Sequence, residues 1–399
     1  MQNSAAPFSV FPPAAQELMA EAKKLLPPKD AATAETAEGK VRQALKFAED
    51  EPAARSSADL GSAYLFLGQI LELQGKPEKV EEAGTFYDRA RDVFTALPDS
   101  HPGLRRLTAL AWMNRGNILQ KLAKPDDVAS YDQAIKLLTD LTSDVEAQSV
   151  LAAVYMNRGT GLQRQNTPEA RKTAADSFAS AITTLERLSS EGNKQFIPLL
   201  AAARVNYAGA LLGVPGSEFK TIRTSAIAAL QIVASAEDKE FGAIDLGLRA
   251  RRILCESIAL LLNNPNLPAN ARGELISEGT DIAEAALSLA GIWETRNVQA
   301  VRPMVGWFFS FGAALYARQQ PQFLTEFLAD TLGADKTPAP WKVAPQLAKI
   351  AVESITLARE SVESRIAQSS NEEQKDALSD TLTELNAAAE KYAPLAKSA

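Results

Sequence analysis

Apolar residues recur along most of the chain with the spacing of an amphipathic α-helix. In the segment that begins at Trp112, the residues Gly116, Leu119 and Ala123 follow at intervals that place all four on one helix face. Turn signals separate such segments. At residues 75–77 (GKP), a glycine ends one segment and a proline lies near the first turn of the next. The pattern predicts a series of helices joined by short connections.

A nine-residue motif recurs within this pattern. Residues 112–120 (WMNRGNILQ) reappear at 155–163 (YMNRGTGLQ), with six identical positions at an offset of 43. Weaker copies lie at 64–71 and 205–212. The small residues at the corresponding position of the four copies are Gly68, Gly116, Gly159 and Ala208. Self-similarity of this kind indicates a repeat architecture.

A second motif, an aromatic residue with alanine three positions later, follows each of the first three copies. It occurs at residues 87–90, 131–134 and 178–181. A small residue on the packed face of one helix lets the next helix approach closely, and a large residue opposite fills the space between them. Each pair of motifs therefore predicts a helical hairpin that stacks on its neighbours to bury its apolar face.

These paired motifs resemble the tetratricopeptide repeat family, and Gly68, Leu71 and Gly75 match the spacing of its first helix. The resemblance covers roughly residues 58–236. It implies an all-α solenoid of antiparallel helix pairs wound into a right-handed superhelix. Successive small residues lie 48, 43 and 49 positions apart, which is longer than the family's usual period of about 34.

Residues 97–102 (LPDSHP), which precede the Trp112 segment, are similar to the linker of kinesin light chain arrays, whose repeats are also long. This likeness implies a cytoskeletal or cargo-type protein partner.

The ends of the chain keep helical patterns without the repeat motif. We predict helices at 13–26, 38–50, 239–262, 269–293, 299–318, 321–332, 344–367 and 371–392, with clear loops at 263–268 and 333–340. The sequence accordingly divides into N-terminal helices or a cap (1–57), the tetratricopeptide-like array (58–236), and degenerate helical repeats that end in an acidic capping helix (237–399).

Composition narrows the range of functions. Hydrophobic residues make up 46% of the chain and charged residues 23%, which suits a packed core. The net charge is −7 and no dense run of Lys or Arg occurs, so we expect no nucleic-acid partner. One histidine (His101) and one cysteine (Cys255) supply neither a metal cluster nor a catalytic triad, and no phosphate-binding glycine loop is present. We expect a protein without enzymatic activity or cofactor, in which Cys255 is a buried, inert thiol.

The most apolar stretch, residues 303–317, is too short to cross a bilayer, so we expect no membrane insertion. The sequence up to Pro7 lacks the basic and apolar parts of a secretory signal, which predicts a cytoplasmic protein.

In tetratricopeptide arrays the first helices line the binding groove, so the resemblance implies that their residues off the packed stripe contact the ligand. Asparagines in such a row can bind a peptide backbone without selecting a side chain; alternatively, they are merely tolerated on a wet helix surface. The binding candidates are Asn114, Asn117, Lys121, Asn157, Thr160, Arg164 and Asn206.

Some family members clamp a terminal carboxylate with lysine and asparagine, but Met113 and Met156 occupy the lysine position here. Arg115 and Arg158 also recur, and we interpret them as packing residues with long aliphatic stems rather than as ligand contacts.

The aromatic run around Phe308 and Phe309 favours a core helix. Because two adjacent residues on one helix cannot face the same neighbour, we expect these two phenylalanines to divide between the core and a second surface. That surface would allow self-association through the C-terminal half.

The leading hypothesis is an adaptor or scaffold that holds an extended peptide or a protein surface in its groove. A second hypothesis is a regulatory sensor that binds a peptide or a small molecule and changes its superhelix. A third is an enzyme that uses carboxylates in a helical cleft.

Overall fold

A computed structural model of the chain describes residues 10–55, 57–98, 103–296, 301–332 and 345–397. All regular structure in these ranges is helical, and no strand occurs in them. The chain forms two compact units, Met1–Ala203 and Arg204–Ala399. The division into segments 1–57, 58–236 and 237–399 rests on the sequence pattern alone and stays a prediction.

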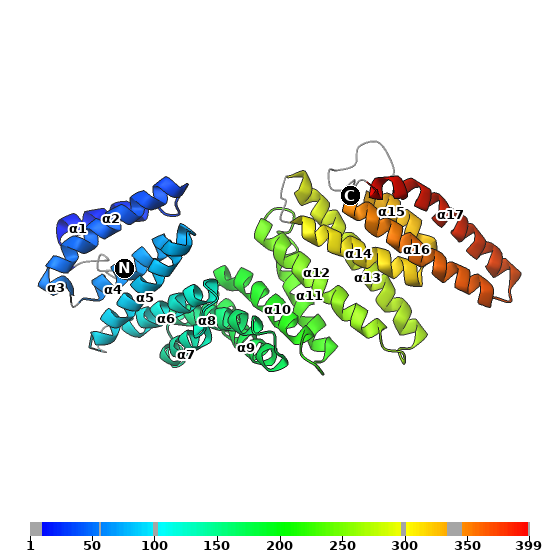
Figure 1. The fold of residues 1–399 in the computed structure, drawn as a ribbon. Helices are drawn as coiled ribbons and strands as arrows, with labels where there is room; N and C mark the ends of the chain where they lie inside the picture. The colour runs from blue at the N-terminus through cyan, green and yellow to red at the C-terminus, as the bar shows by residue number, and fades with distance from the viewer. Residues whose placement is uncertain (1–9, 56, 99–102, 297–300, 333–344, 398–399) are drawn as a thin grey trace. The chain divides into compact units, whose positions relative to one another are not determined.

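The first unit is a succession of antiparallel helix pairs (Figure 1). Helix α1 packs on α2, α4 on α5, α6 on α7 and α8 on α9, and each pair also contacts the next. The elements are α1 (Pro13–Lys24), α2 (Ala31–Asp50), α3 (Pro52–Arg55), α4 (Ala58–Leu73), α5 (Pro77–Ala96), α6 (Leu104–Lys121), α7 (Asp127–Leu138), α8 (Val145–Gln163), α9 (Pro168–Ser190) and η1 (Lys194–Phe196). Helix α10 (Ile197–Leu212) runs from the first unit into the second.

The second unit continues with helices that pack on one another in chain order. Helix α11 contacts α12, α12 contacts α13, α13 contacts α14, and α16 packs between α14 and α17. The short α15 lies against α14 and α16. The elements are α11 (Phe219–Val233), α12 (Phe241–Leu262), α13 (Ala269–Thr295), α14 (Arg302–Gln319), η3 (Pro321–Phe323), α15 (Leu324–Leu332), α16 (Pro345–Gln368) and α17 (Glu372–Ala396).

Short polar side chains fix the helix starts that the sequence pattern predicts. Asp30 accepts a hydrogen bond from the backbone N–H of Thr33, and Thr167 caps α9 through the N–H of Ala170. Pro77 and Pro168 occupy first-turn positions, where a missing N–H costs nothing. The predicted helices therefore agree with the structure to within a few residues, except that the Asp30 cap starts α2 earlier than expected. The predicted loop 333–340 and the His101 linker lie outside the described residues.

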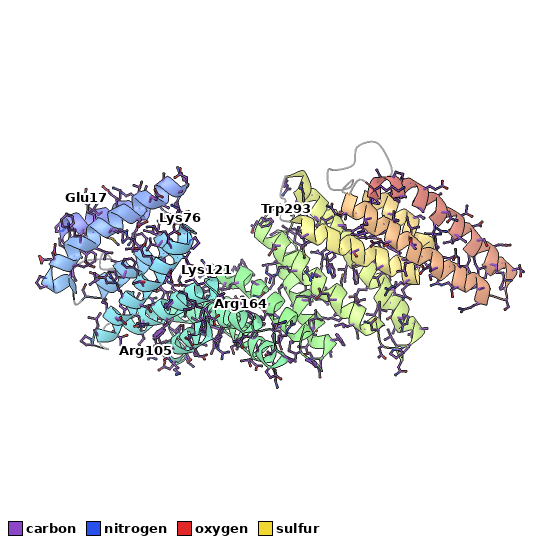
Figure 2. The ribbon with its side chains drawn as sticks, in the orientation of Figure 1. Glu17, Lys76, Arg105, Lys121, Arg164 and Trp293 are labelled. Atoms are coloured by element: carbon purple, nitrogen blue, oxygen red, sulfur yellow. The ribbon has the colours of Figure 1, made fainter. Side chains whose placement is uncertain are left out.

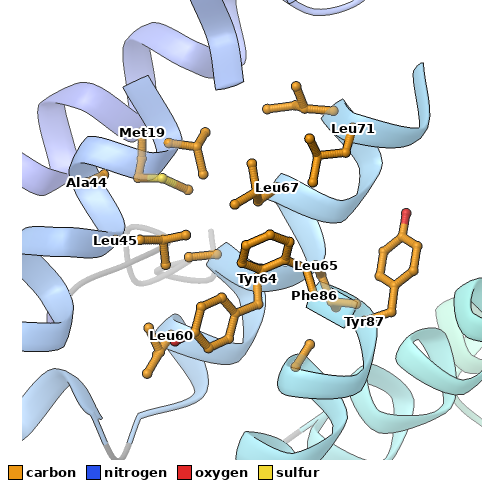
Figure 3. Close-up of a cluster of buried hydrophobic side chains, with 14 of the residues drawn as sticks. Met19, Ala44, Leu45, Leu60, Tyr64, Leu65, Leu67, Leu71, Phe86 and Tyr87 are labelled. Atoms are coloured by element: carbon orange, nitrogen blue, oxygen red, sulfur yellow. The ribbon is translucent and has the colours of Figure 1, made fainter. Parts of the chain in front are cut away.

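The core of the first unit begins where α1, α2, α4 and α5 meet (Figure 3). Met19, Leu45 and Leu67 come from three different helices and are all buried. Tyr64 of α4 lies beside Phe86 of α5, with ring centroids 5.9 Å apart. The N-terminal helices are thus continuous with the core of the following repeat.

The two sequence motifs meet within each helix pair. A Cβ atom built on the first-helix glycine would lie only 2.5–2.7 Å from the aromatic ring of the second helix, so the ring occupies the space that any side chain would need. All three rings are fully buried. The pairs are Gly68 with Tyr87, Gly116 with Tyr131, and Gly159 with Phe178. The close approach of the paired helices that the sequence predicts is confirmed.

Phe308 and Phe309 are both fully buried, so the expectation that one of them faces a second surface is wrong. Helix α14 is covered on several sides, because it contacts α13, α15 and α16. Phe309 stacks on Phe327 of α15, and Phe308 lies edge-on to Trp307. These two rings therefore offer no surface for self-association.

Cys255 is a free, buried cysteine, as predicted. Burial raises the pKa of its thiol well above the usual range. The side chain belongs to the core of the second unit.

Glu38 of α2 is a buried carboxylate that holds α2 to the α4–α5 pair. It accepts hydrogen bonds from Arg42 (2.8 Å), Gln74 (2.6 Å) and Lys79 (2.7 Å). Burial alone would raise its pKa, but the bonds from Lys79, Gln74 and Arg42 outweigh this and lower the pKa to about 2.

We expect Gly116→Ala to lower the free energy of unfolding by about 1–3 kcal/mol, because the new Cβ overlaps the ring of Tyr131. The matched control is Gly39→Ala in α2, where nothing lies within 4 Å of the added Cβ. That change should stabilise the protein by about 0.5–1 kcal/mol through helix propensity. Urea denaturation measures both, and equal stability of the two variants would contradict the tight contact.

We expect Glu38→Gln to lower the free energy of unfolding by about 2–3 kcal/mol at neutral pH, because an amide cannot pair with two cations. The folded-state pKa near 2 lies below the value of about 4.3 in an unfolded chain. The carboxylate therefore stabilises the fold fully above pH 4.3, and this contribution is lost as the pH falls toward 2. Denaturation at a series of pH values should show the gap between wild type and variant closing over that window. Glu17→Gln, at an exposed position of α1, serves as the control; a gap that does not change with pH would rule out the charge effect.

Candidate functional site

The first helices of the repeats lie next to one another in the first unit. Helix α6 contacts α4 on one side and α8 on the other. The ends of these helices form two edges: Lys121 and Arg164 lie at the C-terminal ends of α6 and α8, whereas Arg105 lies near the start of α6 (Figure 2). We call the polar side chains Glu72, Asn114, Asn117, Lys121, Asn157 and Arg164 the first-helix row.

Asn117 is the centre of the first-helix row. Its side-chain oxygen accepts one hydrogen bond from the Tyr131 hydroxyl and another from the side-chain amide of Asn157, each 2.9 Å long. The second bond joins α6 to α8. The amide nitrogen of Asn117 and the side-chain oxygen of Asn157 have no partner among the described residues, so one donor and one acceptor remain available.

Asn114 lies one turn before Asn117 on α6. It is only 7% exposed, and its side chain has no hydrogen-bond partner in the part of the chain that the structure describes. Its amide donors and acceptor are therefore free to bond to a ligand.

Charged residues flank the asparagines. Glu72 of α4 accepts a hydrogen bond from the Tyr87 hydroxyl (2.9 Å) and pairs with Lys121 (2.5 Å). Burial, together with Glu72, raises the pKa of Tyr87 far above its usual value, so this hydroxyl stays a donor. Arg164 donates to the backbone oxygen of Gln120 at 2.7 Å. Charges on this face are therefore largely balanced within the row.

The remaining two candidates lie apart from this network. The exposed Thr160 uses its hydroxyl within α8, where it donates to the backbone oxygen of Met156. Asn206 belongs to the second unit and accepts a hydrogen bond from Arg249 (2.6 Å). The structure thus gathers Asn114, Asn117 and Lys121 with Asn157 and Arg164, and leaves Thr160 and Asn206 outside the first-helix row.

The repeated arginines form ion pairs that join neighbouring repeats. The guanidinium of Arg115 lies 3.0 Å from Asp88 of the preceding second helix, and that of Arg158 lies 2.7 Å from Asp132. Their role is structural, as the sequence indicated, but it includes a charge partner that the sequence interpretation missed. The signal was present, because aspartate follows tyrosine in both second-helix motifs.

Two hollows lie at equivalent positions of successive repeats, with volumes of about 680 and 380 Å³. Trp112 lines the first and Tyr155 lines the second. Arg91 covers the Trp112 ring at 4.7 Å. The sequence pattern predicted that Trp112 lies on the packed face of its helix. It did not predict that Trp112 also lines a partly open hollow.

No helix within the described ranges is long and apolar enough to cross a membrane. No group of His, Cys, Asp or Glu side chains in the same ranges has the arrangement of a metal site.

No protein-family model matches the sequence, and no curated protein matches it. Similar solved structures include a signal transduction ATPase with numerous domains from Pyrococcus horikoshii, which carries a tetratricopeptide repeat sensor (11% identity, TM-score 0.46, 97% of this chain). The chain spans only 54% of that protein's length. Others are the assembly chaperone of RpL4, Acl4 (18% identity, TM-score 0.32, covering 76% of this chain and 96% of that one) and the P58(IPK) tetratricopeptide domain (14% identity, TM-score 0.24, covering 94% and 98%).

The chain itself shows the tetratricopeptide-like arrangement. Its helices pair in succession, and three of the pairs in the first unit (α4–α5, α6–α7 and α8–α9) set a glycine of the first helix against an aromatic ring of the second. The predicted all-α solenoid of antiparallel helix pairs is confirmed. Its right-handed winding stays a prediction.

We expect the Arg158–Asp132 pair to contribute a coupling free energy of about 0.5–1 kcal/mol, because Arg158 is only 20% exposed and also bonds to Ser177. A double-mutant cycle with Arg158→Met and Asp132→Ala, followed by denaturation, measures this coupling. The control cycle uses Lys375 and Glu372 of α17, where the glutamate is 81% exposed and the coupling should be near zero. Equal coupling free energies in the two cycles would contradict the proposal that the Arg158–Asp132 pair stabilises the contact between repeats.

Proposed function

We propose that the chain is a non-enzymatic protein-interaction scaffold whose first-helix row holds an extended peptide segment of a partner protein. The observation that carries the proposal is the set of unused hydrogen-bonding groups at Asn114, Asn117 and Asn157. These are neutral donors and acceptors on two adjacent first helices. They suit the alternating N–H and C=O groups of a peptide backbone.

The charge balance of the row favours backbone recognition over selection of one charged side chain. Lys121 is paired with Glu72, and Arg164 lies 3.8 Å from Asp127. Both cations are therefore already engaged. The proposed partner is a protein, and the kinesin light chain likeness of the sequence makes a cytoskeletal or cargo-type protein one version of it.

A regulatory sensor is the second candidate, favoured by the bonds that link α6 to α8. The Asn157–Asn117 bond and the Arg164–Gln120 bond both cross the boundary between repeats. A ligand that competes for the Asn117 oxygen would release one of these links and change the angle between the repeats. Small-angle X-ray scattering separates the two functions: a change in radius of gyration on peptide binding supports the sensor, and no change supports the scaffold.

We expect Asn114→Ala combined with Asn157→Ala to weaken peptide binding by about 30-fold, since each neutral hydrogen bond contributes only about 1 kcal/mol and the two together about 2 kcal/mol. The ligand is an extended peptide selected from a random library on the full-length protein, and calorimetry gives its affinity. The matched control changes the exposed second-helix residues Gln133 and Asp176 to alanine. Circular dichroism checks the fold of each variant. Equal loss of affinity from both pairs, or none from the asparagines, would place the site elsewhere.

A further inference from the structure

The second unit carries a groove between α13 and α15 that is distinct in chemistry from the first-helix row. Two adjoining hollows of about 380 and 350 Å³ share Glu284, Phe327 and Asp330 in their walls. The two hollows therefore adjoin along these three residues, and they are treated together as one groove. We call it the α13–α15 groove.

The floor of the α13–α15 groove is apolar. Leu287 and Phe327 are buried at its base, and the Tyr316 ring from α14 lies against Phe327 with centroids 5.1 Å apart. Phe323 stands at the mouth with 46% of its surface exposed. This exposed ring extends the apolar floor toward solvent.

Carboxylates line both sides of the floor. Asp281 and Glu284 come from α13, and Glu326 and Asp330 come from α15; no Lys or Arg is among the described lining residues. Glu284 accepts a hydrogen bond from Tyr316, but the other three form no ion pair with any residue that the structure describes. Four neighbouring negative charges without counter-charges repel one another, so a cationic ligand would relieve that repulsion.

Thr331 adds a polar group to the wall of the groove. This residue lines the groove and is 9% exposed, yet its hydroxyl has no hydrogen-bond partner among the described residues. Other helical threonines of this unit, such as Thr280 and Thr356, bond to a carbonyl of their own helix. This hydroxyl therefore lies at the groove wall, where a group of a bound peptide can bond to it.

We infer that the α13–α15 groove binds a basic amphipathic segment of a partner protein. Apolar side chains of that segment pack on Leu287, Phe323 and Phe327, and lysines or arginines on its edges pair with the carboxylates of α13 and α15. Helix α15 has nine residues, which corresponds to about 13 Å of helix, so the groove holds two to three turns of a docked helix. A nucleic acid is excluded by the sign of the charge, and a simple cation would not use the apolar floor.

The probe is a fluorescent 14-residue peptide of leucine and lysine in amphipathic helical order, titrated into the full-length protein while anisotropy is recorded. We expect Glu326→Lys combined with Asp330→Lys to weaken its binding by about tenfold or more. The matched control, Glu372→Lys with Glu373→Lys on α17, keeps the same net charge and should change affinity less than about twofold. Phe323→Ser, at a position where 46% of the side chain is exposed, should weaken binding as well.

Two comparison peptides separate the apolar contribution to binding from the electrostatic one. A peptide with serine in place of leucine should bind much more weakly, and one with glutamate in place of lysine should not bind. Hydrogen exchange with the bound peptide should protect α13 and α15. The inference is overturned if both charge reversals weaken binding equally, if the serine peptide binds as well as the leucine peptide, or if the protected amides lie on the first helices of the other unit.

Discussion

The contact between a first-helix glycine and a second-helix aromatic ring sets the geometry of the repeats and also positions the candidate site. The ring of Tyr131 packs where Gly116 has no side chain, and its hydroxyl donates a hydrogen bond to Asn117, the next residue of α6. Tyr87 does the same at Gly68 and reaches Glu72. One side chain thus fixes the helix spacing through its ring and organises the polar surface through its hydroxyl. Phe178 keeps only the first of these functions, because it lacks the hydroxyl.

Repetition explains why the fold could be predicted from this sequence. The same helix pair is specified three times, by the glycines Gly68, Gly116 and Gly159 and the aromatic residue that follows each of them. Three copies of both motifs in the same order are too many to arise by chance. The C-terminal helices lack the motif, yet turn signals such as residues 263–268 marked their ends. Which face of α14 is covered could not be predicted, since that depends on α15 and α16 folding back against it.

The site was harder to predict because a helix position does not reveal its partners across the repeat boundary. Asn114 and Asn157 occupy equivalent positions, but Asn157 has Asn117 within reach while Asn114 has no partner. The α13–α15 groove has no sequence signature either. Its carboxylates lie about forty to fifty residues apart along the chain, and only the turn at η3 brings α15 beside the face of α13 that carries them. In both places the informative feature is a polar group left without a partner by the fold, which is a property of three-dimensional packing.

The ion pairs between repeats also make the array modular. Arg115 and Arg158 each follow the same Met-Asn pair and precede a glycine, and each faces an aspartate on the helix behind it. A second copy of residues 116–158 inserted after Arg158 would restore the same motif at its junction and present matching charges on both sides. A duplication at this point would therefore lengthen the array while keeping the arginine–aspartate pair at the new junction, which offers a route to grooves of different length.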